Sequence, residues 1–169
     1  TFTYPENLGE GKLYGAQENL QHLLLGEAFE QAGDMAQAKA HYEAASKGLS
    51  EPKSAVYYND QPPETIFCQG LALEKCGKSD EAKKRFESLL SFADAHQNDT
   101  VKIDYFAVSL PDFLVFDEDL EQKNRVHCRF MRALGLLGLG KKEAAAAFDA
   151  LSTAEPAHAA AGLYREIFA

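Results

Sequence analysis

The chain contains few side chains whose type and spacing could support catalysis. His127 and Cys128 are adjacent, and an imidazole beside a thiol can generate a reactive thiolate. On a helix, however, neighbouring side chains point about 100° apart and do not face one another. We therefore expect no nucleophilic pair here, and the sequence predicts no catalytic residue and no enzymatic activity for this chain by itself.

Metal-binding and phosphate-binding motifs are not found in the sequence either. The acidic run Asp117–Asp119 lacks the alternating ligands and the glycine of a calcium loop, so it is better interpreted as a helix start. The segment GEGK at Gly9–Lys12 lacks the spacing of a phosphate loop. The histidines stand singly, without the spacing of metal ligands, at His22, His41, His96, His127 and His158. We expect neither a metal nor another cofactor.

The charge and the apolar pattern limit the partners. The 169 residues carry a net charge of −9 and no cluster of Lys or Arg, which argues against nucleic acid and anionic lipid. An apolar run of about 18 residues and a signal peptide are both missing, so we expect no membrane contact. Cys68, Cys76 and Cys128 are odd in number and predict free thiols in the cytoplasm. Because the chain begins at Thr1 without Met, we expect a piece of a longer protein.

The elements that would position any site are revealed by an internal repeat. Two stretches superimpose without a gap: Gly26-x2-Phe29-x3-Gly33-x4-Ala38-x3-Tyr42 and Gly70-x2-Leu73-x3-Gly77-x4-Ala82-x3-Phe86. A weaker third copy is one residue shorter in its turn: Ala133-x2-Leu136-x3-Gly140-x3-Ala144-x3-Phe148. A small residue where two helices touch, a turn glycine and an aromatic residue at these spacings are the tetratricopeptide pattern of helical hairpins.

The sequence therefore predicts one all-α domain of about three tetratricopeptide-like hairpins with an apolar insertion and a C-terminal capping helix. The expected parts are an extended lead-in (1–16), repeat 1 (17–48), repeat 2 (62–96), the insertion (97–118), repeat 3 (119–152) and the capping helix (155–169). Gly33 and Gly77 should end the first helices of their hairpins, and Asp34 and Ser79 should cap the helices that follow. Glu30 is expected on the outer face.

The insertion is too apolar for a solvated loop. Large apolar side chains are frequent between Ile103 and Phe116, and a soluble protein rarely leaves such a patch in water. The segment could form a short helix before Pro111 followed by an extended stretch, or a strand through Phe106, Val108 and Leu110. We expect it to pack either in the groove of its own chain or against a partner.

Three long strings resemble a known family. They are YPENLGEGKLYGAQENL (Tyr4–Leu20), YYNDQPPETIFCQGLAL (Tyr57–Leu73) and KIDYFAVSLPDFLVFDEDLEQKNRVHC (Lys102–Cys128). Together they are similar to the C-terminal region of large bacterial tetratricopeptide proteins, whose N-terminal part is an uncharacterised β-sandwich that looks like a domain of carbohydrate enzymes. The resemblance implies that this chain is the helical-repeat part of a larger protein, and it carries no catalytic residue over.

The concave groove is the first candidate binding surface. Matching the repeat frames places one side chain per turn of each first helix on the inner surface: Leu23, Glu27, Gln31, Phe67, Leu71, Lys75, Phe130 and Leu134. This row lacks the Lys, Asn and Arg clamp for a C-terminal carboxylate, so that ligand is not expected. The alternative is that Phe67 and Phe130 touch the insertion, which would fill the groove from within.

A loop is the second candidate surface. Two aromatic rings and two side-chain amides follow one another at Tyr57, Tyr58, Asn59, Asp60 and Gln61, and they could bind a sugar or a peptide. Docking of this loop against the neighbouring hairpins explains the same residues.

The pattern as a whole favours a non-catalytic interaction or scaffold module within a larger bacterial protein. The expected partner is a protein, a peptide or the missing N-terminal domain of the same chain, and a homodimer is compatible with the sequence. The alternative is an accessory domain of a carbohydrate-active enzyme whose catalytic domain lies upstream. A free-standing enzyme with a site in the groove is a third, weaker alternative.

Overall fold

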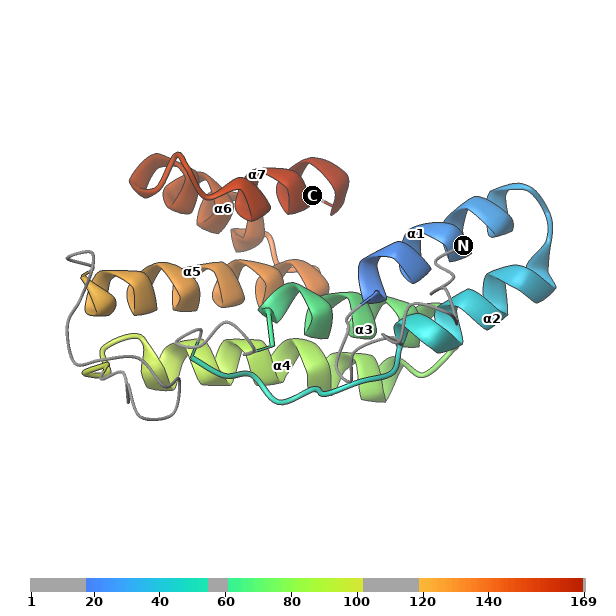
Figure 1. Cartoon of the computed structure of the whole chain (residues 1–169), viewed down its shortest axis with the longest axis horizontal. Helices are drawn as coiled ribbons and strands as arrows, with labels where there is room; N and C mark the ends of the chain where they lie inside the picture. The colour runs from blue at the N-terminus through green and yellow to red at the C-terminus, as the bar shows by residue number, and fades with distance from the viewer. Residues whose placement is uncertain (1–17, 55–60, 102–118, 169) are drawn as a thin grey trace, which may run out of the picture.

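A computed structural model describes residues 18–54, 61–101 and 119–168, and this part of the chain is entirely helical, as predicted. Its helices are α1 (Asn19–Gln31), α2 (Met35–Ala45), α3 (Pro63–Lys75), α4 (Ser79–His96), α5 (Leu120–Gly138), α6 (Glu143–Ala154) and α7 (Ala159–Phe168) (Figure 1). None of these helices is both long enough and apolar enough to cross a membrane. The lead-in 1–16, residues 57–60 of the candidate loop and most of the insertion (102–118) lie outside the described residues.

Consecutive helices pack as pairs. α1 packs against α2, α3 against α4 and α5 against α6, while α4 and α3 also contact α5. In Figure 1, α3, α4 and α5 form the middle of the molecule, α1 and α2 extend from one end, and α6 and α7 lie on the other side of α5. The first helices of the three pairs, α1, α3 and α5, are therefore connected through α3, which contacts both α1 and α5.

The same turn ends the first helix of each pair. Gly33, Gly77 and Gly140 have positive φ angles of 81°, 75° and 62°, which glycine adopts without strain. After each glycine the next backbone N–H donates to the carbonyl five residues back, as in Asp34 N to Phe29 O at 2.9 Å. Each glycine N–H donates to the carbonyl three residues back. These are three Schellman motifs, and the turn prediction for Gly33 and Gly77 is confirmed.

Glycines let an aromatic ring enter each of the first two pairs. A Cβ atom on Gly26 would lie 2.5 Å from Cε1 of Tyr42, and one on Gly70 would overlap the ring of Phe86. Phe86 is also covered from α5, where a Cβ atom on Gly138 would overlap the same ring. Phe86 is 1% exposed, so it is held between α3 and α5 by two residues without side chains.

The cap predictions divide into one confirmed and one wrong. The Gln37 N–H donates to Asp34 Oδ1 at 3.1 Å, which confirms the cap of α2. Ser79 is instead the first residue of α4, and the preceding Lys78 makes no side-chain cap bond. Because Lys78, the residue after the Schellman turn at Gly77, is the N-cap, α4 begins one residue earlier than predicted. The acidic residues Asp80 and Glu81 in its first turn interact favourably with the positive end of the helix dipole.

Glu30 is also placed differently from the expectation. Its carboxylate accepts a hydrogen bond from the Tyr42 hydroxyl at 2.5 Å and one from Lys75 Nζ at 2.6 Å. The side chain is therefore not on an isolated outer face, because it links α1 to α2 and to α3. These two donors lower the pKa of Glu30.

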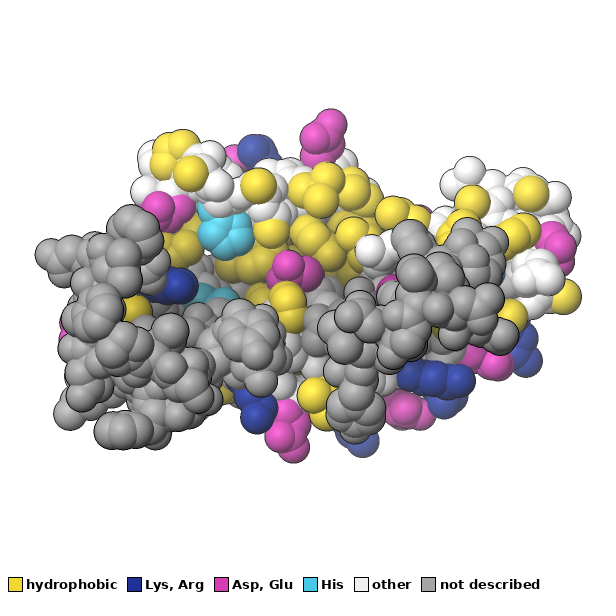
Figure 2. Space-filling view, viewed as in Figure 1, with side chains coloured by type: hydrophobic (Ala, Val, Ile, Leu, Met, Phe, Trp, Pro, Cys, Tyr) yellow, Lys and Arg dark blue, Asp and Glu magenta, His cyan; other side chains and the backbone are white. Residues whose placement is uncertain are grey.

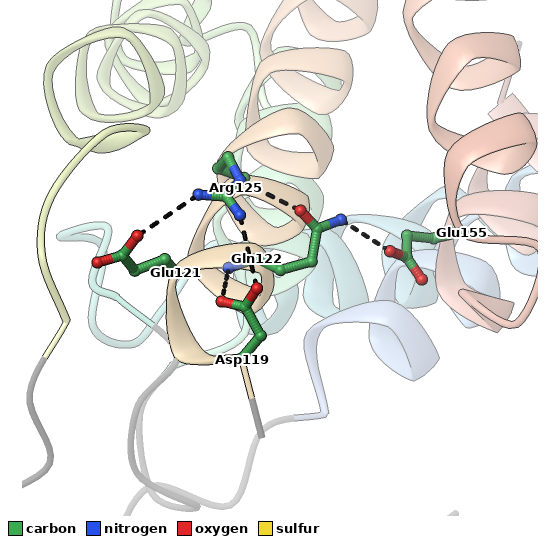
Figure 3. Close-up of polar contacts among 5 residues, drawn as sticks. All are labelled: Asp119, Glu121, Gln122, Arg125 and Glu155. Atoms are coloured by element: carbon green, nitrogen blue, oxygen red, sulfur yellow. Dashed lines mark hydrogen bonds and ion pairs between the residues drawn. The ribbon is translucent and has the colours of Figure 1, made fainter. Parts of the chain in front are cut away.

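The start of α5 fixes the segment between α6 and α7. Asp119 Oδ1 accepts from the Gln122 N–H at 2.8 Å and so caps α5 (Figure 3). Gln122 Nε2 in turn donates to Glu155 Oε1 at 3.0 Å, and Arg125 Nε donates to Gln122 Oε1 at 3.1 Å. The hydrogen bond between Gln122 and Glu155 anchors the residues that precede α7, the predicted closing helix.

Two glycine substitutions test the packing around Phe86. Gly70→Ala should destabilise the fold by roughly 1–3 kcal/mol, because the new methyl group must displace the Phe86 ring. Gly162→Ala is the matched control, since no heavy atom of the described residues lies within 4 Å of a Cβ there, and it should stabilise α7 by up to about 1 kcal/mol. Urea unfolding of both variants measures the difference. Equal changes in the two variants would contradict this packing.

Candidate functional site

The apolar members of the predicted groove are part of the core. Leu23, Phe67 and Leu134 are fully buried, and Phe130 is 2% exposed. None of these side chains offers surface to a partner in this structure. Their repeat positions do bring them to the inner helices, since Leu23 lies on α1, Phe67 on α3 and Phe130 with Leu134 on α5.

The helix α7 covers this inner surface. The ring centroid of Phe67 lies 5.9 Å from that of Tyr164 and 5.5 Å from that of Phe168, both in edge-to-face geometry. Tyr164 also meets Phe130, with centroids 6.2 Å apart. The inner surface is thus filled from within by the C-terminal helix, whereas the sequence predicts the insertion in that role. The insertion between 102 and 118 lies outside the described residues.

The polar members of the predicted groove lie nearer to solvent. Gln31 is exposed, and Glu27 and Leu71 are partly buried. Lys75 is exposed but engaged, because its ammonium group pairs with Glu30 and lies 5.6 Å from the centroid of the Tyr42 ring. The binding roles of these residues stay predictions, and Lys75 has a structural role at the junction of α1, α2 and α3.

A pocket remains open where α1 and α7 flank the beginning of α3. It has a volume of about 280 Å³, and its walls include Leu20 of α1 and Leu163 of α7. Its α3 side is formed by Glu64, Thr65 and Cys68, with Tyr164 beside them. Sequence reasoning missed this pocket, because no repeat frame indicates where α7 lies relative to α1.

Exposed apolar side chains continue from the pocket along both flanking helices. Leu24 follows Leu20 by one turn of α1 and is 39% exposed, and Ile167 follows Leu163 by one turn of α7. Leu163 and Ile167 are 46% and 42% exposed. Hydrophobic side chains gather over α7 and towards α1 in Figure 2. We call the pocket together with Leu24 and Ile167 the α1–α7 groove.

The thiol and the phenol at this pocket are both neutral. Cys68 Sγ lies 3.6 Å from the Tyr164 hydroxyl, and burial raises the pKa of Cys68 to about 12. Burial also raises the pKa of Tyr164. A thiol reacts as its thiolate, so Cys68 is a poor nucleophile in this environment. The groove therefore offers apolar surface and a carboxyl group, that of Glu64, rather than an activated nucleophile.

The described end of the candidate loop is structural. Gln61 is 5% exposed, and its side-chain amide donates to the Leu49 carbonyl and, at 2.8 Å, to the Thr65 hydroxyl. Gln61 thus fits the alternative in which the loop docks on its neighbours. The other four residues of that loop, Tyr57 to Asp60, lie outside the described residues.

The histidine and cysteine side chains that were considered for chemistry have separate partners. His127 Nε2 lies 2.8 Å from the Lys53 carbonyl oxygen, and the Cys128 thiol is 3.8 Å from Asn124 Oδ1. The expectation that every histidine stands singly is wrong for His22 and His41, whose Nδ1 atoms are 2.9 Å apart across the α1/α2 hairpin. Among the described residues, no group of three or more His, Cys, Asp and Glu side chains could hold a metal ion.

A second cavity, of about 420 Å³, lies beside the end of α4. Its histidine and its aspartate are already paired, with His96 Nδ1 at 2.7 Å from Asp99 Oδ2. None of its described lining residues is an exposed large apolar side chain, in contrast to the α1–α7 groove.

No family model matches the chain, and no solved structure matches it.

Thiol accessibility tests the described environment of the cysteines. In the folded protein Cys76, which is partly exposed, should react first with a thiol reagent such as 5,5′-dithiobis(2-nitrobenzoate). Cys68 and Cys128 are buried and their pKa values are raised to about 12 and about 11, so they should react only as the protein unfolds. Cys76→Ser should remove the fast phase. Three thiols reacting at one rate without denaturant would contradict this assignment.

Proposed function

We propose that this chain is a tetratricopeptide-like interaction module that binds a segment of a partner protein in the α1–α7 groove. The observation that carries the proposal is a pair of apolar stripes on the two helices that flank one pocket: partly buried Leu20 with exposed Leu24 on α1, and exposed Leu163 with Ile167 on α7. Small soluble proteins place such apolar surface at sites of interaction.

The repeat character of the proposal rests on the agreement between sequence and local geometry. Three Schellman turns recur at Gly33, Gly77 and Gly140, and a glycine faces an aromatic ring in both α1/α2 and α3/α4. The same positions form the internal repeat of the sequence. Stacked helical hairpins of this kind commonly present an extended binding surface.

The proposal includes a larger context that the sequence resemblance implies. The chain would act in the cytoplasm as the helical part of a larger bacterial protein. Its partner would be another protein or a domain of the same longer chain. An accessory role beside an upstream carbohydrate-active domain would use the same groove for contact within that longer chain.

The size of the groove predicts moderate affinity. Covering a leucine side chain completely is worth roughly 1.5–3 kcal/mol, and these side chains are already more than half covered. Association and ordering costs offset part of that gain. We therefore expect a dissociation constant on the order of micromolar for a single short segment.

Selection of binding peptides tests this function. A displayed library of 16-residue peptides should yield peptides that bind the native protein. Leu163→Asn and Leu24→Asn should each raise the dissociation constant of these peptides at least about tenfold, because each variant places an amide on the apolar wall. Fluorescence anisotropy measures the affinities.

Met35→Asn is the matched control, because Met35 is 58% exposed at the start of α2 and does not line the pocket. Native-like unfolding curves for all three variants are required. Selected peptides that lose affinity with Met35→Asn but not with Leu163→Asn would place the binding surface elsewhere and contradict the proposal.

A further inference from the structure

The carboxyl group of Glu64 has no assigned role in the fold. Glu64 lies in the first turn of α3, is partly buried and lines the pocket of the α1–α7 groove. Among the described residues, no side chain forms an ion pair or a hydrogen bond with it. The dipole of α3 favours the charged form, yet burial raises the pKa of Glu64, so the helix terminus does not compensate fully for the loss of water.

A second carboxyl group, that of Glu27, lies on α1. Glu27 follows Leu20 by seven positions and Leu24 by three, and residues at these spacings lie on one stripe of a helix. The negative charges of Glu64 and Glu27 both contribute to the raised pKa of the Cys68 thiol, of which burial is the main cause. The leucine side chains of α1 and α7 that line the pocket therefore lie beside the Glu64 carboxyl group of α3, which pairs with no described side chain.

Two described cations on α3 and α7 are already paired with other acids. The Lys75 ammonium group on α3 lies 2.6 Å from Glu30, and Arg165 on α7 lies 2.8 Å from Asp149 of α6. The whole chain has a net charge of −9, which also favours a partner of positive charge. Two carboxylates without further ligands do not form a site for a divalent cation.

We propose that the α1–α7 groove binds an amphipathic helix whose apolar face covers the leucine stripes and whose Lys or Arg side chain pairs with Glu64. This inference rests on the proposed function and specifies the chemistry of the partner. The apolar residues of α1 and α7 recur one helical turn apart, which suits an apolar face with the i and i+4 spacing of a helix. A cation that enters the pocket would give Glu64 a charged partner, which no described side chain provides.

A pair of synthetic helices tests the inference. One 16-residue peptide carries Leu on one face and Lys at the edge of that face, and its counterpart has Gln in place of each Lys. At 150 mM salt the native protein should bind the Lys peptide at least about fivefold more tightly than the Gln peptide, as expected for one charge-assisted hydrogen bond. This comparison uses only the native protein and does not depend on the folding of a variant.

Two charge variants separate pairing at Glu64 from general attraction. Glu64→Gln should abolish most of the preference for the Lys peptide. Glu143→Gln removes the same charge from the first turn of α6, away from the pocket, and should leave the preference unchanged. An equal effect of the two variants, or equal binding of the two peptides, would overturn the inference.

Leu163→Asn distinguishes failure of the inference from failure of the proposed function. If the two peptides bind equally and Leu163→Asn weakens both, the groove is retained and the cation pairing is overturned. If Leu163→Asn leaves the binding of both peptides unchanged, the peptides bind elsewhere, and both the inference and the groove proposal are contradicted.

Discussion

The arrangement of the described helices depends on the position of one ring, that of Phe86. It projects from α4 into a space that Gly70 of α3 and Gly138 of α5 leave open, and a methyl group at either glycine would overlap it. Protein interiors are packed too densely to absorb such an overlap without movement of the neighbours. The two glycines thus determine how closely α3 and α5 approach α4, and this approach fixes the middle of the molecule on which the other helices pack.

From Phe86 the aromatic packing continues to the C-terminal helix. Phe67 lies 5.8 Å from Phe86 and also contacts Tyr164 and Phe168, so a single ring of α3 joins the centre to α7. In this position α7 covers the inner surface of α3 and α5 and leaves the space beside α1 open. The α1–α7 groove is therefore a consequence of core packing: the same helix that buries the predicted apolar surface creates the new one.

Local features could be predicted from the sequence, and distant contacts could not. The turns at Gly33 and Gly77 and the Asp34 cap each depend on residues within one helical turn, so the pattern of residue types is sufficient to predict them. The contact between Glu30 and Lys75 spans 45 positions, and that between Cys68 and Tyr164 spans 96. Such contacts depend on the rotation of one helix pair against another, which the repeat spacing does not specify.

The candidate site shows the same division. Phe67 lies on α3 and Phe130 on α5, each the first helix of its pair, but the solvent exposure of a position depends on what covers it. Because the sequence predicts a closing helix without its docking site, it indicates neither the burial of Phe67 nor the opening beside Leu163. The sequence does not single out Glu64 for a related reason. An acid in the first turn of a helix is common, and only its burial makes the lack of an ion-pair partner among the described residues informative.

The candidate groove depends on the contact between α3 and α7, and nuclear Overhauser effects between aromatic rings detect this contact. In protein with labelled Phe and Tyr rings, we expect cross-peaks from the Phe67 ring to the rings of Tyr164 and Phe168, whose centroids lie 5.9 Å and 5.5 Å away. The Phe67→Leu variant assigns these peaks. Cross-peaks from Phe67 to Phe86 without any to Tyr164 or Phe168 would show that α7 does not cover α3, and the α1–α7 groove would then not exist as described.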